Sequence, residues 1–109
     1  MIWIMGTERS AGTRSRLRFS PPKQYNVIMH NDDFTTMDFV VMVLMTVFYK
    51  DRETATRLMM DVHHSDRATV GTYSLDVAKS KVDKATEMAR QEGFPFLMTI
   101  EPAEDVLPF

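Results

Sequence analysis

The sequence predicts a single compact α+β domain of order β-α-α-β-α-β, in which three helices pack on one face of a three-stranded antiparallel sheet. Two kinds of apolar spacing lead to this prediction. Apolar and polar residues alternate over residues 25–30 and 96–101, as in strands with one buried face. Apolar residues recur every three or four positions over residues 55–62 and 75–89, as in helices with one buried stripe. The length of 109 residues suits one domain.

Two adjacent prolines, Pro21 and Pro22, mark where folded structure is expected to begin, because proline extends no helix and rarely enters a central strand. The residues before them show no sustained apolar periodicity. We therefore expect a disordered N-terminal arm over residues 1–22, a folded core over residues 23–103 and a flexible C-terminal tail over residues 104–109.

The first half of the core is expected to be a strand, a loop and a helix. The strand covers residues 25–30, and residues 37–49 form a nearly continuous apolar run. Its thirteen residues are long for a strand and therefore favour a helix. Either Thr35 or Thr36 can cap this helix. A helix that is apolar on nearly every side must be buried, or must present a face to a partner.

The second half of the core is expected to be a helix, a strand, a long helix and a strand. The helix covers about residues 51–66, and a short strand follows over residues 68–73. Ser74 is a credible N-cap for the long helix, and Gly93 supplies its left-handed C-terminal cap. Pro102 ends the last strand.

Charge and composition exclude several classes of function. Residues 1–22 hold four arginines and one glutamate, so the remaining residues hold nine basic and fourteen acidic side chains. An acidic folded part argues against nucleic acid as the main partner. No apolar run is long enough for a membrane span, and the absence of cysteine fits a protein of the reducing cytoplasm. No phosphate loop or hydrolase motif is present, so we expect no cofactor and no enzyme.

A metal site is one alternative, because His63 and His64 lie near Asp61 and Asp66. Adjacent histidines on a helix point about 100° apart, so both cannot readily bind one ion. His63 is also favoured near a helix C-terminus by the helix dipole. We therefore expect no metal site, and a metal-dependent hydrolase is the least favoured hypothesis.

The loop over residues 31–37 carries three adjacent side chains with acceptor oxygens, Asn31, Asp32 and Asp33. Such residues form turns and helix caps, but they can also bind a cation. If the second helix packs near this loop, the two would enclose an apolar hole with His63 at its mouth. The hole would be lined by Met37, Val40, Met59 and Val62. It would suit a ligand with an ammonium group at one end and an apolar group at the other.

These residues also carry a family resemblance. The run Asn31-Asp32-Asp33-Phe34-Thr35, with the run over residues 55–63, resembles the ClpS adaptor family. Further matching segments are residues 21–28, 37–40 and 77–82. The motifs stand in the right order and spacing, and the match covers about residues 21–103.

The resemblance implies an adaptor of the N-degron pathway, which binds the N-terminal residue of a substrate and delivers it to a Clp-family AAA+ unfoldase. By matching positions, the substrate α-ammonium would be held by Asn31, Asp32 and His63. The rim would be shaped by Asp33 and Thr35. The pocket for a Leu, Phe, Tyr or Trp side chain would be lined by Met37, Val40, Met59, Val62 and Phe96. Met37 would discriminate against β-branched side chains.

The resemblance also implies a surface for the unfoldase and shows departures from the family pattern. Asp76 and Lys81 match positions that contact the unfoldase N-terminal domain, and residues 1–22 match the arm used in delivery. Phe96 replaces a common aliphatic residue, which would narrow the pocket. We expect a monomer. The alternative is a generic interaction scaffold that uses the methionine-rich first helix, although most of these methionines are interpreted as core filler.

Overall fold

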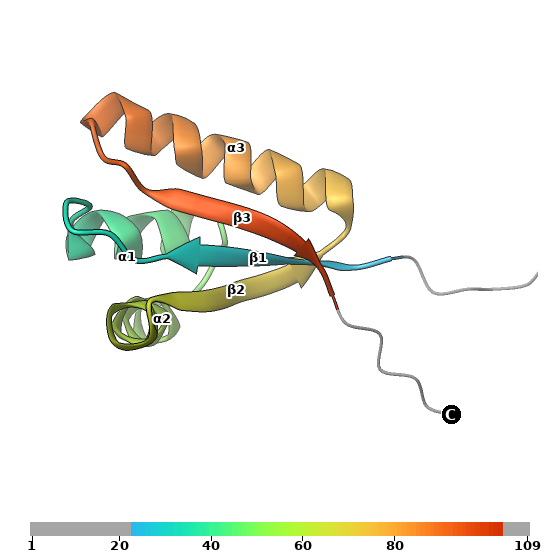
Figure 1. The fold of residues 1–109 in the computed structure, drawn as a ribbon, viewed down its shortest axis with the longest axis horizontal. Coiled ribbons are helices and arrows are strands. Elements are labelled where there is room, and N and C mark those ends of the chain that lie inside the picture. Colours follow the sequence, from blue (N-terminus) through green and yellow to red (C-terminus); the bar gives the residue numbers. More distant parts are fainter. Residues whose placement is uncertain (1–22, 104–109) are drawn as a thin grey trace, which may run out of the picture.

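The computed structural model describes residues 23–103, so the predicted arm (1–22) and tail (104–109) lie outside the described residues. Six elements follow the predicted order (Figure 1). They are β1 (Tyr25–His30), α1 (Met37–Thr46), α2 (Arg52–Ser65), β2 (Arg67–Tyr73), α3 (Leu75–Glu92) and β3 (Leu97–Pro102). The strands form one antiparallel sheet and the helices cover one of its faces, which confirms the predicted fold class.

The central strand of the sheet is β1, and the strand order is β2-β1-β3. Val27 and Met29 point toward the helices and are completely buried in the core. Ile28 points to the opposite face, because successive side chains of a strand alternate. There an ion pair of 2.8 Å joins Arg67 of β2 to Glu101 of β3 across β1. β1 is therefore paired with a strand on both sides up to His30, where the loop over residues 31–37 begins.

The helix predicted to reach Tyr49 ends at Thr46, so its predicted end was wrong. Val47 and Phe48 are buried although they lie beyond α1. Tyr49 then takes a left-handed conformation with φ of 56°, which turns the chain toward α2. The apolar run correctly indicated burial, but burial continues past the helix, and no glycine or proline marks where the helix stops.

Three of the other helix ends follow the capping residues of the sequence. The carboxylate of Asp51 accepts a hydrogen bond of 2.8 Å from the Thr54 N–H at the start of α2. Gly93 ends α3 with φ of 76°, as predicted, and Asp66 ends α2 with φ of 72°. Ser74 occupies the N-cap position of α3, but its side chain makes no capping hydrogen bond. The predicted N-cap position was therefore correct.

The methionines divide between the core and the surface. Met29 and Met98 of the sheet are buried, as is Met59 of α2. Met37 and Met42 of α1 and Met60 of α2 are exposed by 49%, 38% and 37%. The interpretation of the helical methionines as mostly core filler was therefore wrong. One side of α1 is buried in the core, whereas Met37 and Met42 are exposed to solvent. That this exposed side binds a partner stays a prediction. Within residues 23–103, no helix is both long and apolar enough to cross a membrane.

Candidate functional site

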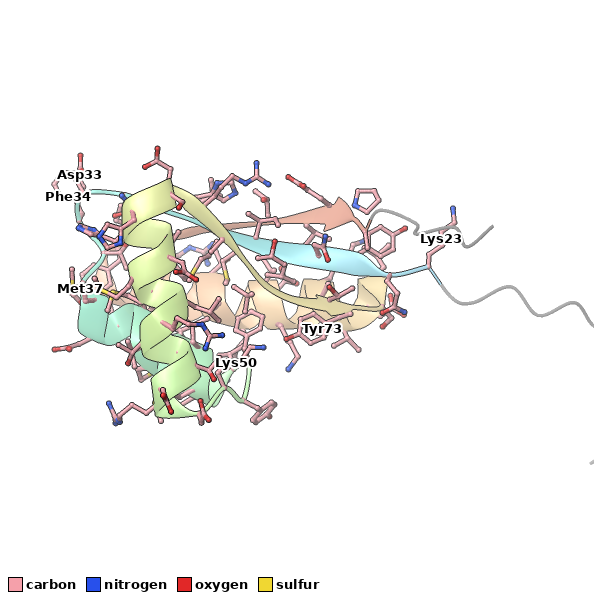
Figure 2. All side chains as sticks on the ribbon, turned by 90° about the horizontal axis from the view of Figure 1, so that it is seen from below. Lys23, Asp33, Phe34, Met37, Lys50 and Tyr73 are labelled. Carbon is pink, nitrogen blue, oxygen red and sulfur yellow. The ribbon has the colours of Figure 1, made fainter. Side chains whose placement is uncertain are left out.

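A pocket of about 270 Å³ lies where the loop over residues 31–37 meets α1 and α2. Its lining consists of Asn31, Asp32, Asp33, Thr35, Met37, Val40, Met59, Val62 and His63. The structure therefore brings together nine of the ten side chains predicted for the α-amino site, rim and pocket. Figure 2 shows Asp33 and Phe34 at the outer tip of the loop and Met37 at the first turn of α1.

Asp32 organises the loop. Its Oδ1 accepts hydrogen bonds from the N–H groups of Phe34 at 2.8 Å and Thr35 at 2.7 Å. Its Oδ2 accepts a hydrogen bond of 2.8 Å from the Thr35 hydroxyl. An ionised carboxylate offers about four acceptor positions, so the three hydrogen bonds from Phe34 and Thr35 leave one unused. Asp32 thus shapes the loop and still presents a negative charge.

The environment of Asp32 keeps it ionised. Partial burial raises the pKa of this carboxyl, but the hydrogen bonds from Thr35 and Phe34 outweigh that effect and hold the pKa below its ordinary value of 3.8. Because the pKa is lowered in the folded protein, the hydrogen bonds to Asp32 stabilise the fold at neutral pH. That contribution is lost only as the pH falls through the lowered pKa. Asp32 therefore stays anionic throughout the pH range from 8 to 5.

Two further hydrogen bonds fix the ends of the loop. At its start, the Asn31 N–H donates to the Asp66 carbonyl at 2.8 Å, which ties the loop to the end of α2. At its end, the Thr36 hydroxyl accepts from the Phe39 N–H at 3.2 Å and caps α1. Of the two predicted caps, Thr36 fills the role, since Thr35 bonds to Asp32 instead. The hydrogen bonds that cap α1 and fix the loop therefore also position Asn31 and Asp32, the residues that carry the acceptor side chains.

The pocket has an apolar floor and a polar mouth. Val40, Met59 and Val62 are 6%, 8% and 5% exposed, so they form a floor with little access to solvent. Asn31 and His63 are exposed at the mouth. Among the described residues, no hydrogen-bond partner engages the Asn31 side-chain amide or the His63 ring.

Phe96 is the one predicted pocket residue that does not line the pocket. It is only 6% exposed and packs edge to face against Phe39, with 5.9 Å between ring centroids. Phe39 also meets Phe94 in the same geometry at 5.1 Å. Phe96 belongs to an aromatic cluster of the core. It can affect the shape of the pocket only indirectly, through its contact with Phe39 of α1.

The adjacent residues His63 and His64 of α2 differ in their surroundings. His63 lines the pocket, whereas the Nδ1 atom of His64 lies 2.9 Å from the Met60 carbonyl, one turn back on the helix. Their rings meet edge to face with centroids 5.5 Å apart. Across residues 23–103, no three histidine, aspartate or glutamate side chains are grouped as a metal site requires.

The two predicted unfoldase contacts lie on α3, away from the pocket. Asp76 is exposed in the first turn of the helix. Lys81 is half-buried, and its Nζ donates to the Val47 carbonyl at 2.9 Å. The same ammonium lies 4.6 Å from the centroid of the Tyr49 ring. Lys81 therefore stabilises the fold by donating to a backbone carbonyl at the C-terminal end of α1. It also holds the exposed ring of Tyr49 in place by a cation–π interaction.

A second hollow, of about 610 Å³, adjoins the pocket along α1 and α2. It shares Met37 and Met59 with the pocket and extends past Met42 and Met45 to Arg52. Its residues were not among the predicted site residues, although the alternative scaffold hypothesis placed an interaction surface on this methionine-rich helix. The sequence signal was the nearly continuous apolar run of α1, which also fits a helix buried in the core.

Comparison with known proteins gives a consistent result. The family model described as ATP-dependent Clp protease adaptor protein ClpS matches residues 20–99. The ATP-dependent Clp protease adapter protein ClpS of Acetivibrio thermocellus is 49% identical over 84 residues, which are 77% of this chain and 85% of that protein. The protein of the same name from Burkholderia cenocepacia is 46% identical over 90 residues, covering 83% and 86% of the two chains. The structure of Agrobacterium tumefaciens ClpS2 bound to L-phenylalaninamide superposes with a TM-score of 0.74 at 38% identity, covering 76% of this chain and all of that one.

Proposed function

Because the chain belongs to the ClpS family and is thus an adaptor of the Clp protease, we propose that it selects substrates by their N-terminal residue. The substrate would present a free α-ammonium group and a bulky apolar side chain, namely Leu, Phe, Tyr or Trp. L-Phenylalaninamide, the compound bound by the similar protein ClpS2, has both features. The observation that carries the proposal is the convergence of free acceptors and a buried apolar floor on one pocket.

The mouth of the pocket matches the hydrogen-bonding needs of an α-ammonium. This group donates three hydrogen bonds, and burying it without acceptors is costly. Asn31 offers its side-chain oxygen, Asp32 its remaining acceptor position, and His63 an unprotonated ring nitrogen. Three donors therefore meet three acceptors, and the charge of Asp32 strengthens its bond to the cation. Asp33 and Thr35 complete the rim.

The floor of the pocket matches one apolar side chain. Pockets for drug-sized ligands measure about 300–1,000 Å³, so a volume of about 270 Å³ suits a single residue. Burying a side chain such as Leu or Phe contributes about 1.5–3 kcal/mol. Val40, Met59 and Val62 supply the apolar surface, with Met37 at the entrance. Phe96 has no direct part in this proposal, because it lies behind Phe39.

Acetylation of the peptide N-terminus tests the proposal. A peptide that begins with Phe should bind, and its acetylated form should bind about tenfold or more weakly, because acetylation removes the charge and two of the three donors. Fluorescence anisotropy with the two labelled peptides measures this difference. Equal affinities would contradict the proposal and would instead favour a scaffold that binds internal apolar segments.

The role of His63 predicts a dependence on pH. Histidine is the side chain that changes charge between pH 5 and 8, and a protonated ring can neither accept from the ammonium nor avoid repelling it. Peptide affinity should therefore fall about five- to tenfold between pH 7 and pH 5. Asp32 stays ionised over this range, so it does not contribute to the loss. The interval lies below the ordinary pKa of a peptide α-amine, about 7.7–8.0, so the peptide stays charged.

The neighbouring histidine provides the control for this prediction. A His63→Gln variant should bind more weakly at pH 7 and lose the dependence on pH. A His64→Gln variant should retain the dependence, because His64 does not line the pocket and its Nδ1 atom lies 2.9 Å from the Met60 carbonyl. If His63→Gln keeps the wild-type pH profile, His63 has no role in binding the ammonium.

Delivery requires a second surface, which we propose lies on α3. There Asp76 and Lys81 would contact the N-terminal domain of a Clp-family AAA+ unfoldase, and residues 1–22 would engage the unfoldase during delivery. Support comes from the position of α3 away from the pocket, which leaves both surfaces accessible together (Figure 1). We further propose that the adaptor acts as a monomer in the cytoplasm, a reducing compartment that the absence of cysteine fits.

A further inference from the structure

The larger hollow between α1 and α2 continues directly from the proposed substrate pocket, because both are lined by Met37 and Met59. We refer to it as the methionine groove. Met42 and Met45 extend its lining along α1, and Met42 is 38% exposed. Flexible thioether side chains on a surface adapt to varied apolar partners. The groove therefore offers an apolar surface at the point where a bound N-terminal residue leaves the pocket.

The length of the methionine groove matches a short extended peptide. From Met37 to Thr46, α1 rises about 14 Å. An extended chain advances about 3.3 Å per residue, so four residues cover this distance. Side chains of an extended segment alternate, so positions 3 and 5 of a substrate point to the same side as position 1. With position 1 in the pocket, position 3 reaches the methionines and position 5 reaches the far end.

At the far end of the groove lies Arg52, which forms no ion pair with any residue from 23 to 103. Arg52 is the first residue of α2, where the helix dipole disfavours a positive charge. Within the described part of the chain, no carboxylate pairs with Arg52, whereas Arg67 and Arg90 both form ion pairs. Its position at the groove therefore suits an acidic group of a ligand.

We propose that the methionine groove binds positions 2 to 5 of the substrate in extended form, with an apolar side chain at position 3 and an acidic one at position 5. This inference rests on the proposed function, because the N-terminal residue in the pocket sets the register. It adds to recognition of the first residue a preference among the residues that follow. L-Phenylalaninamide has no residues to place in the groove, so it reports on the pocket alone.

Titration calorimetry with three ligands tests the proposal: L-phenylalaninamide, the peptide Phe-Ala-Ala-Ala-Ala and the peptide Phe-Ala-Leu-Ala-Asp, both peptides amidated. The last peptide should bind about 5- to 20-fold tighter than the alanine peptide. A Met42→Glu variant should remove most of this advantage and leave the affinity for L-phenylalaninamide unchanged. Met60→Glu is the matched control, because Met60 is 37% exposed on α2 but does not line the groove. It should change none of the three affinities.

A second variant tests the charged end independently of the methionines. Arg52→Glu should reverse the preference at position 5, so that Lys binds more tightly than Asp there. If the wild type binds Phe-Ala-Leu-Ala-Asp and Phe-Ala-Ala-Ala-Ala with equal affinity, the groove proposal is wrong. It is also wrong if Met42→Glu and Met60→Glu lose the same affinity for Phe-Ala-Leu-Ala-Asp. Neither result contradicts the proposed pocket. Failure of L-phenylalaninamide to bind the wild type would overturn the proposed function, and the groove proposal with it.

Discussion

Replacing Asp32 with alanine should weaken binding of a Phe-initiated peptide by about 2–3 kcal/mol, roughly 30- to 150-fold. Two losses combine in this variant. The ammonium loses its only charged acceptor among the three at the mouth. The loop also loses the carboxylate that accepts one hydrogen bond from Phe34 and two from Thr35, so the turn that follows Asp32 is no longer held in shape.

A second substitution separates these two losses. In Asp32→Asn, the amide oxygen can still accept from the backbone of Phe34 and Thr35, so the loop should keep its shape while the charge is removed. This variant should bind about tenfold more weakly than the wild type, between the wild type and Asp32→Ala. The difference in peptide affinity between Asp32→Asn and Asp32→Ala measures the contribution of loop geometry, separately from the contribution of the negative charge.

The control is Asp61→Asn, which removes an exposed carboxylate of α2 that lines neither hollow. It should bind like the wild type. Circular dichroism melts of all three variants establish that each is folded before its affinity is measured. If Asp32→Ala binds within about twofold of the wild type, the acceptors of the loop serve only its own structure.

Much of the fold follows from local spacing in the sequence. Alternation over β1 and the stripe of Ala55, Leu58, Met59 and Val62 each match a buried surface in the structure. The site follows in part from the same signals. Helix-cap chemistry locates the loop over residues 31–37, and the stripe on α2 locates the wall opposite. Both are short-range features of the sequence. That the loop and the α2 stripe lie next to each other in one pocket was indicated by the resemblance to ClpS.

The errors arise where one signal has two structural outcomes. Val47 and Phe48 are buried although they lie beyond the end of α1, so the apolar pattern of the sequence does not show where the helix ends. Phe96 was assigned to the pocket from the family resemblance, but its apolar ring packs against Phe39 in the core. The exposure of Met42 depends on how far α1 and α2 separate along their length. That separation is a tertiary property which no local pattern encodes.

The exposure of Met37 bears on whether it filters substrates by shape. A core methionine truncated to alanine costs about 2–5 kcal/mol of stability, but Met37 is 49% exposed and lines the entrance to the pocket. We therefore expect Met37→Ala to change selectivity and leave stability nearly unchanged. β-branched side chains are stiff at χ1, so Ile and Val cannot turn their second branch away from a side chain at the entrance.

Peptides that begin with Leu and Ile, otherwise identical, measure this filter. The wild type should prefer Leu by about 1–3 kcal/mol, roughly 5- to 150-fold, because a clash is needed to separate two side chains of equal volume. In Met37→Ala the preference should narrow to about threefold or less, mainly through tighter binding of the Ile peptide. Met60→Ala removes a methionine from an exposed site outside the pocket and should keep the wild-type preference. If Met37→Ala weakens both peptides equally, Met37 supplies apolar contact to any substrate, and the selection by shape must arise from the buried floor of Val40, Met59 and Val62.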